Sequence, residues 1–227
     1  MDFSRRALLA KTLGVLGAVS GAGAVAAVCG ATHRQDEGPY YPKKDKNRDN
    51  DLAQFHKGGP LAKGELIYLA GQVLGTDCKP LAGVLVEIWQ AAASGKYNHS
   101  GDTNPLPADP NFQYWGRSTT GPDGKYAFRT VIPGHYPLTP ALVGVSPTGP
   151  NQYRPPHIHF KVHAPRGYLS LTTQMYFDPK TYDDADLAKT VSDLNRWEGV
   201  DGDLMVRFAE AGGVKSGTFD IVLKRLS

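Results

Sequence analysis

The stretch RPPHIHF, residues 154–160, determines both the expected fold and the search for a functional site. In a β-strand, residues i and i+2 point to the same face, so His157 and His159 share one side. Ile158 and Phe160 share the other side, which predicts a face packed in a core. Two imidazole rings then lie next to each other on the opposite face. The alternative is a pair of half-exposed surface histidines, and the rest of the chain must distinguish the two.

Short apolar or alternating runs continue on both sides of this stretch, separated by Gly, Pro, Asn and Asp. One segment, 181–197, has helical spacing, and it is short. The pattern predicts an all-β fold, a β-sandwich of about seven to nine strands with one short helix and long loops. The expected strands are 65–74, 83–90, 125–132, 156–163, 171–177, 204–209 and 217–225.

Composition and charge exclude some classes of function. The 227 residues suit one domain with an ample core. The formal net charge is +3, and the first 31 residues contribute +2 of it. The remainder is near neutral and has no Lys/Arg block, so nucleic acid is not expected as a partner and no anionic membrane patch is indicated.

The N-terminal segment, residues 1–31, is predicted to be a targeting segment. Its Ser-Arg-Arg followed by a run rich in Leu, Ala and Gly resembles a twin-arginine signal peptide, which predicts export to the periplasm or the extracellular space. Ala22-Gly23-Ala24 and Ala24-Val25-Ala26 are candidate cleavage sites. A retained membrane anchor is the alternative, but no stable membrane span is expected after cleavage. A polar arm, 32–63, would then lead into the β-sandwich catalytic domain, 64–227.

The chain has two cysteines, Cys29 and Cys78. If the whole predicted targeting segment, residues 1–31, is removed, the exported chain keeps a single thiol and no intrachain disulfide is possible. The residues before Cys29 match a lipoprotein site poorly. No Cys/His cluster predicts structural zinc.

Two tyrosines lie in unusual settings. Tyr97 occurs in SGKYNH, after a strand, and Tyr136 in PGHYP, a loop bounded by prolines. Each alone is typical of a packing residue. Two segments, 71–90 and 120–136, also have the strand-and-turn pattern of small transthyretin-like modules. A non-catalytic exported β-sandwich binding module is therefore an alternative function, and a different metal on the His-x-His strand is another.

Taken together, the motifs resemble the intradiol ring-cleavage dioxygenases, the family of protocatechuate 3,4-dioxygenase and catechol 1,2-dioxygenase. The resemblance covers about residues 37–224, and the order and spacing of the motifs make it specific. The chain lacks the long helical N-terminal region of the catechol enzymes, which favours the protocatechuate-like branch in shape. The motifs are EGPYYP, GVLVEIWQ with GKYNH, DPNF, GRSTT with DGKYAFRTVIPG, HYP, RPPHIHF, LTTQMYF and FDIVLKR.

The resemblance implies a non-haem Fe(III) dioxygenase that adds both atoms of O2 to a catechol-type ring. Cleavage between the two hydroxyl-bearing carbons would give a cis,cis-muconate type diacid. The implied metal ligands are Tyr97 and Tyr136 with His157 and His159. Tyr136 and His159 would be axial, and Tyr136 would also take a substrate proton when released. Phenolate is a hard anionic donor suited to Fe(III), and imidazole is a neutral one.

Two further residues are implied at the site. Arg154 would stabilise negative charge that develops on the ring, and Gln174 would assist it. The alternatives are that Arg154 is an ordinary surface residue and that the Gln174 amide satisfies backbone groups. Leu138 departs from the protocatechuate enzymes, which commonly have an aromatic residue after Tyr-Pro, so the ring substituents of the substrate stay open. A homo-oligomer is expected, and a partner chain is the other possibility.

Overall fold

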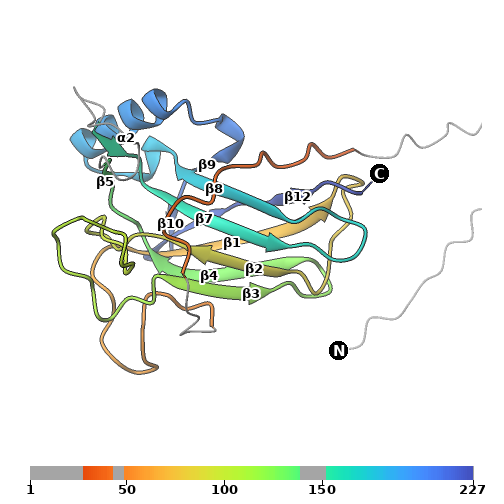
Figure 1. Ribbon diagram of the computed structural model, residues 1–227, viewed down its shortest axis with the longest axis horizontal. Coiled ribbons are helices and arrows are strands. Elements are labelled where there is room, and N and C mark those ends of the chain that lie inside the picture. Colours follow the sequence, from red (N-terminus) through yellow and green to blue (C-terminus); the bar gives the residue numbers. More distant parts are fainter. Residues whose placement is uncertain (1–27, 43–48, 139–151, 227) are drawn as a thin grey trace, which may run out of the picture.

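The structure is a computed structural model that describes residues 28–42, 49–138 and 152–226. Two five-stranded sheets pack on each other as the two layers of a β-sandwich (Figure 1). Side chains from both sheets fill the space between them, among them Ile67 and Phe128 from one layer and Ile88 and Phe160 from the other. The predicted all-β sandwich is confirmed.

The first sheet is organised around its longest strand, β1. β1 pairs antiparallel with β4 on one side and parallel with both β11 and β12 on the other. At Asp220 the chain leaves the ladder, because the Asp220 side chain accepts the Gln72 N–H, so the single strand expected at 217–225 is two strands. The sheet contains β1 (Leu66–Gly75), β4 (Lys125–Val131), β10 (Ala209–Ala211), β11 (Val214–Thr218) and β12 (Ile221–Leu223).

The second sheet carries the candidate site on its outer face. Directly paired residues of antiparallel strands share a face, and the register places His159 between Trp89 and Gln174. The next pair is His157 opposite Tyr176. The sheet order is β3 (Trp115–Thr119), β2 (Leu85–Trp89), β7 (His157–His163), β8 (Leu171–Phe177) and β9 (Met205–Val206).

The opposite face of β7 belongs to the core, as the alternation predicts. Ile158, Phe160 and Val162 are fully buried between the two sheets. β3 is not among the expected strands, because residues 115–119, WGRST, show no apolar alternation. Its backbone pairing with β2, from Leu85 to Trp89, holds it in the sheet.

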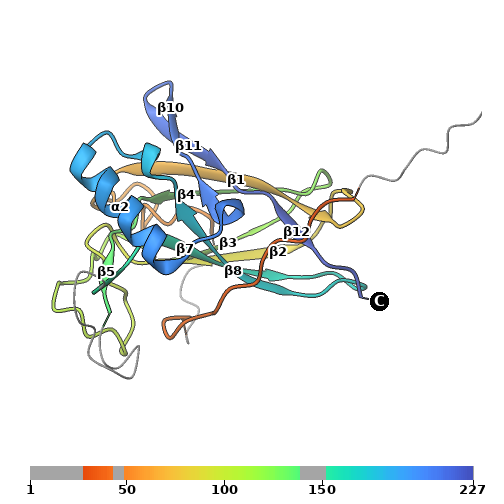
Figure 2. The ribbon, with the colours of Figure 1, turned by 90° about the horizontal axis from the view of Figure 1, so that it is seen from above.

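Two short strands and one helix lie at the end of the sandwich where the candidate site is found. β5 (Tyr136–Pro137) pairs with β6 (Tyr153–Arg154) in a separate ribbon. The helix α2 (Ala185–Glu198) follows a 3-10 turn, η1 (Pro179–Thr181), and contacts β6. Figure 1 and Figure 2 both show α2 beside β5 at this end. A second 3-10 turn, η2 (Gly202–Leu204), leads into β9.

An N-terminal arm, here residues 28–42, runs across the outer face of the second sheet. Its backbone bonds to β8: Gln35 N–H donates to Thr172 O, at 3.0 Å, and Asp36 O accepts from Gln174 Nε2, at 2.8 Å. Glu37 forms an ion pair with Lys161 of β7, at 2.6 Å. The covered face explains why every residue of β8 is buried.

The two cysteines of this chain are paired, an arrangement that the sequence analysis did not predict. Cys29 and Cys78 form a disulfide, with Cα atoms 5.3 Å apart, and Cys29 N–H also bonds to Thr76 O. The sequence reading missed this bond because it assigned Cys29 to the targeting segment. Most of that segment, 1–27, and both candidate cleavage sites lie outside the described residues. Within the described ranges no helix has the length and apolar character needed to cross a bilayer.

Candidate metal centre

The centre is built on the outer face of β7. The Nε2 atoms of His157 and His159 lie 3.1 Å apart, and both rings are buried. His157 Nδ1 lies 2.7 Å from Pro155 O, so it carries the proton and Nε2 presents a lone pair. Two nitrogens at right angles, each about 2.1 Å from one ion, would be about 3.0 Å apart. The pair therefore fits two adjacent ligands of a single metal ion.

Burial keeps both imidazoles neutral, the form that binds metal. It lowers the pKa of His159 to about 3 and that of His157 well below its ordinary value, and the Arg154 cation acts in the same direction on both. Trp89 stacks on the His159 ring, with centroids 4.6 Å apart and planes within 6°. The stack fixes the ring orientation, so the nitrogens are held in place before any metal arrives.

These pKa values make a prediction for the metal-free protein. Because the folded state keeps the histidines neutral while the unfolded state protonates them near pH 6.5, stability is expected to fall as the pH drops from about 6.5 toward 5. The loss approaches about 1.4 kcal/mol per pH unit for each histidine once the unfolded state is protonated. Denaturant unfolding of metal-free protein at several pH values measures it. A His157→Gln/His159→Gln variant should show a shallower slope; an equal slope would contradict the assignment.

Tyr97, in a loop, and Tyr136, at the start of β5, complete the cluster, and the segments that carry them are tied together. Gly134 N–H donates to Ala92 O, at 3.0 Å, and a Cβ on Gly95 would lie only 2.3 Å from His135 O. This close approach requires glycine at position 95. The Tyr97 and Tyr136 rings meet edge to face, with centroids 5.4 Å apart, and each lies beside one of the histidines.

The surroundings of the two phenols suit a bound cation. Tyr97 Oη is buried and has no hydrogen-bond partner among the residues described. Burial raises the pKa of both phenols, most strongly that of Tyr97, so neither would ionise without a nearby positive charge. A trivalent cation supplies that charge, and phenolate is the hard donor it prefers. The described residues contain no group of three or more His, Cys, Asp or Glu side chains that could hold a metal instead.

Arg154 and Gln174, both predicted at the site, are brought together beside the ligands. The register places Arg154 opposite Tyr136 in the β5–β6 ribbon. Arg154 Nη2 donates to Gln174 Oε1, at 3.0 Å, and to Tyr176 Oη, at 3.1 Å. Its Nε is buried and has no partner among the described residues. A buried unpaired donor beside two phenols suits an anionic oxygen atom of a bound molecule.

Three further contributors were not assigned to the site from the sequence. Tyr176 shares its face with Gln174, because the two lie two residues apart on β8, but its bond to Arg154 depends on the fold. Glu198 forms an ion pair with Arg154, at 2.7 Å, from 44 residues farther along the chain. Tyr40 is buried and packs on Tyr97, with centroids 4.6 Å apart.

The other histidines do not join the centre. His99 packs on Tyr40, with centroids 5.6 Å apart, and His135 packs on Tyr153. His163 bonds to Glu87, at 2.6 Å, and His56 packs on Phe55. The set of ligands implied by the resemblance therefore needs no addition.

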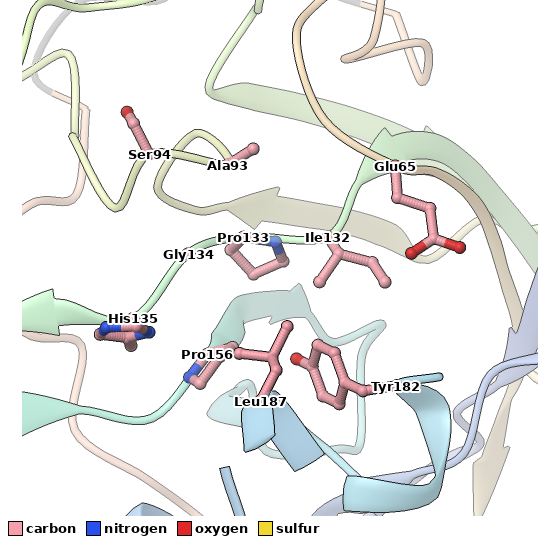
Figure 3. A pocket seen from close by; sticks show the side chains of 10 residues that line it. All are labelled: Glu65, Ala93, Ser94, Ile132, Pro133, Gly134, His135, Pro156, Tyr182 and Leu187. Atoms are coloured by element: carbon pink, nitrogen blue, oxygen red, sulfur yellow. The ribbon is translucent and has the colours of Figure 1, made fainter. Parts of the chain in front are cut away.

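A pocket of about 310 Å³ lies behind the loops that carry the ligands. Figure 3 shows Ile132 and Pro133 on one side of it and Leu187 and Tyr182 on the other. Its lining includes His135 and Pro156, which neighbour two candidate ligands in the chain, but none of the four candidate ligands. It is therefore separate from the cluster of phenols and imidazoles.

Comparisons with known proteins match dioxygenases. A family model described as Dioxygenase (Dioxygenase_C) matches residues 36–225. The protocatechuate 3,4-dioxygenase beta chain of Burkholderia cepacia is 40% identical over 147 residues, 63% of this chain and 58% of the relative. The chlorocatechol 1,2-dioxygenase of Pseudomonas sp. strain P51 is 32% identical over 184 residues, 75% of this chain and 67% of the relative.

A solved structure is similar over most of its length. It is the dioxygenase domain of a dioxygenase carbohydrate-binding protein fusion from Streptomyces sp. SirexAA-E, with 30% identity and a TM-score of 0.59. The match covers 87% of this chain and 100% of that domain. The alignments to the two curated relatives, by contrast, span 58% and 67% of their lengths.

Proposed function

Since this chain belongs to the Dioxygenase_C family of dioxygenases, we propose that it is an intradiol ring-cleavage dioxygenase that uses O2 to open a catechol-type ring. The product would be a diacid of the cis,cis-muconate type. One observation carries the proposal. Two imidazole Nε2 atoms 3.1 Å apart face two buried phenols, with an arginine that has an unpaired buried donor beside them.

The residues fit a ferric ion, which Tyr97, Tyr136, His157 and His159 would hold. When bound, Fe(III) would act as a Lewis acid that ionises the phenols and the diol and makes the ring reactive toward O2. The Tyr136 Oη would accept a proton from the diol, because its ring lies beside His157 and at the Arg154 end of the cluster.

The surrounding side chains prepare the site for negative charge. The Arg154 guanidinium would stabilise charge that develops on the ring, and Gln174 and Tyr176 hold it through hydrogen bonds. Tyr40 and Trp89 cover the centre with apolar ring surface. Excluding water in this way strengthens each of these electrostatic interactions.

We also propose that the protein is exported. The twin-arginine resemblance motivates the proposal, and the Cys29–Cys78 disulfide supports it, because such bonds persist in oxidising compartments. A cut that retained the bond would fall before Cys29, as both candidate cleavage sites do. The homo-oligomer stays a prediction; all four candidate metal ligands come from one chain.

The first test is the visible spectrum and the iron content of the purified protein. We expect about one iron per chain and a phenolate charge-transfer band that shifts when catechol is added without O2. With O2, catechol, protocatechuate and hydroxyquinol are compared for equimolar oxygen uptake and diacid formation. Tyr136→Phe should weaken the band and slow turnover. The control is Tyr153→Phe, at the residue before Arg154 in β6, which should leave both unchanged. Protein that stays colourless and inactive after loading with Fe(III) would favour the binding-module alternative.

A further inference from the structure

The helix α2 ends on the guanidinium of the candidate centre. Its last residue, Glu198, lies 2.7 Å from Arg154 Nη2 through Oε1. Both side chains are largely buried, with 17% of Arg154 and 22% of Glu198 exposed. Such a partly buried, charge-assisted contact is stronger than an ordinary surface ion pair.

The chain fixes this position of Glu198 from both sides. Three residues earlier on the same helix, the buried Asn195 donates through Nδ2 to Phe177 O, at 2.9 Å, at the end of β8. Immediately after Glu198 the helix ends at Gly199, in the left-handed conformation. The anchor and the stop place the carboxylate beside the strand that carries Gln174 and Tyr176.

The placement does not serve the helix itself. A carboxylate at a helix C-terminus faces the negative end of the macrodipole and is locally unfavourable. A negative charge also offsets part of the positive charge that Arg154 would offer a substrate. A locally unfavourable group held by specific contacts is typical of a functional site.

Resting on the proposed function, we propose that Glu198 is a positioning residue for ring cleavage. Arg154 Nη2 has two hydrogens and three neighbouring acceptors, on Gln174, Tyr176 and Glu198. The charged Glu198 contact sets the rotation of the guanidinium, and with it the direction of the unpaired Nε–H. In the contacts described, Glu198 bonds to Arg154 and to none of the four candidate ligands, so it would act through Arg154.

Glu198→Gln and Glu198→Ala test this role, with Asp193→Asn on the exposed side of the same helix as control. Asp193 pairs only with exposed partners, Lys189 and Arg196, in the contacts described. We expect kcat to fall about tenfold in Glu198→Ala and less in Glu198→Gln, which keeps an acceptor oxygen. KM, iron content and the visible band should stay near the wild-type values. Asp193→Asn should match the wild type throughout.

A double-mutant cycle with Arg154→Gln separates positioning from a structural role. If Glu198 acts through Arg154, Glu198→Gln should have no further effect on kcat once Arg154 is replaced. Additive losses, or normal kcat in both Glu198 variants, would overturn the inference alone. No ring cleavage by iron-loaded wild type would overturn the proposed function and this inference together.

Discussion

Replacing His159 by alanine is expected to abolish iron binding and to reduce ring cleavage at least a hundredfold. The residue supplies one of the two converging Nε2 atoms, and the His157 nitrogen alone cannot hold an ion between them. Loss of a residue that merely supports a ligand already costs about 10- to 100-fold in metal affinity or activity, so loss of a ligand should cost more. Iron content, the visible band and turnover are measured on the same preparations.

The matched control lies on the same strand and the same face. His163→Ala removes an imidazole four residues after His159 on β7. The His163 side chain bonds to Glu87 and not to the centre. This variant should keep its iron and its activity. Because His159→Ala also removes the stack on Trp89, His159→Gln is the second variant, which retains more of the side-chain volume. A His159→Gln protein with a full iron complement and normal turnover would exclude His159 as a ligand.

The placement of the two histidines could be predicted from the sequence because local geometry alone determines it. The two-residue period of a strand puts His157 and His159 on one face and Ile158 in the core, whatever the rest of the fold does. Tyr97 and Tyr136 could be assigned only through the resemblance, because the segments that carry them meet through tertiary contacts, Gly134 with Ala92 and Gly95 with His135. No period in the sequence encodes that approach.

Glu198 and Tyr40 were not assigned to the centre because their positions depend on long-range packing. Glu198 follows a helix whose anchor, Asn195, bonds to a strand end 18 residues earlier. Tyr40 is brought to the centre by an arm that crosses the second sheet and is held there by hydrogen bonds to β8. Motif spacing describes neither arrangement.

Removing the disulfide is expected to lower the free energy of unfolding by about 4 kcal/mol, a chain-entropy figure for a closed loop of this size. Cys29 and Cys78 are 49 residues apart in the sequence, so the bond restricts a long segment of the unfolded chain. Denaturant unfolding of Cys29→Ser/Cys78→Ser against wild type measures the loss. Wild type treated with a reductant should approach the variant, while the variant itself should not respond to the reductant.

The Cys29→Ser/Cys78→Ser substitution is also expected to affect the candidate centre, because the disulfide holds the N-terminal arm. The disulfide fixes one end of residues 28–42, and the other end carries Gly38 and Tyr40. A Cβ on Gly38 would lie 3.4 Å from the His159 ring, and Tyr40 packs on Tyr97, so a loosened arm exposes two candidate ligands to water. We expect faster proteolysis within the arm and a several-fold lower kcat/KM, with iron still bound. If the variant unfolds at the wild-type denaturant midpoint and resists proteolysis equally, the arm is held by its hydrogen bonds to β8 and the disulfide is dispensable for the centre.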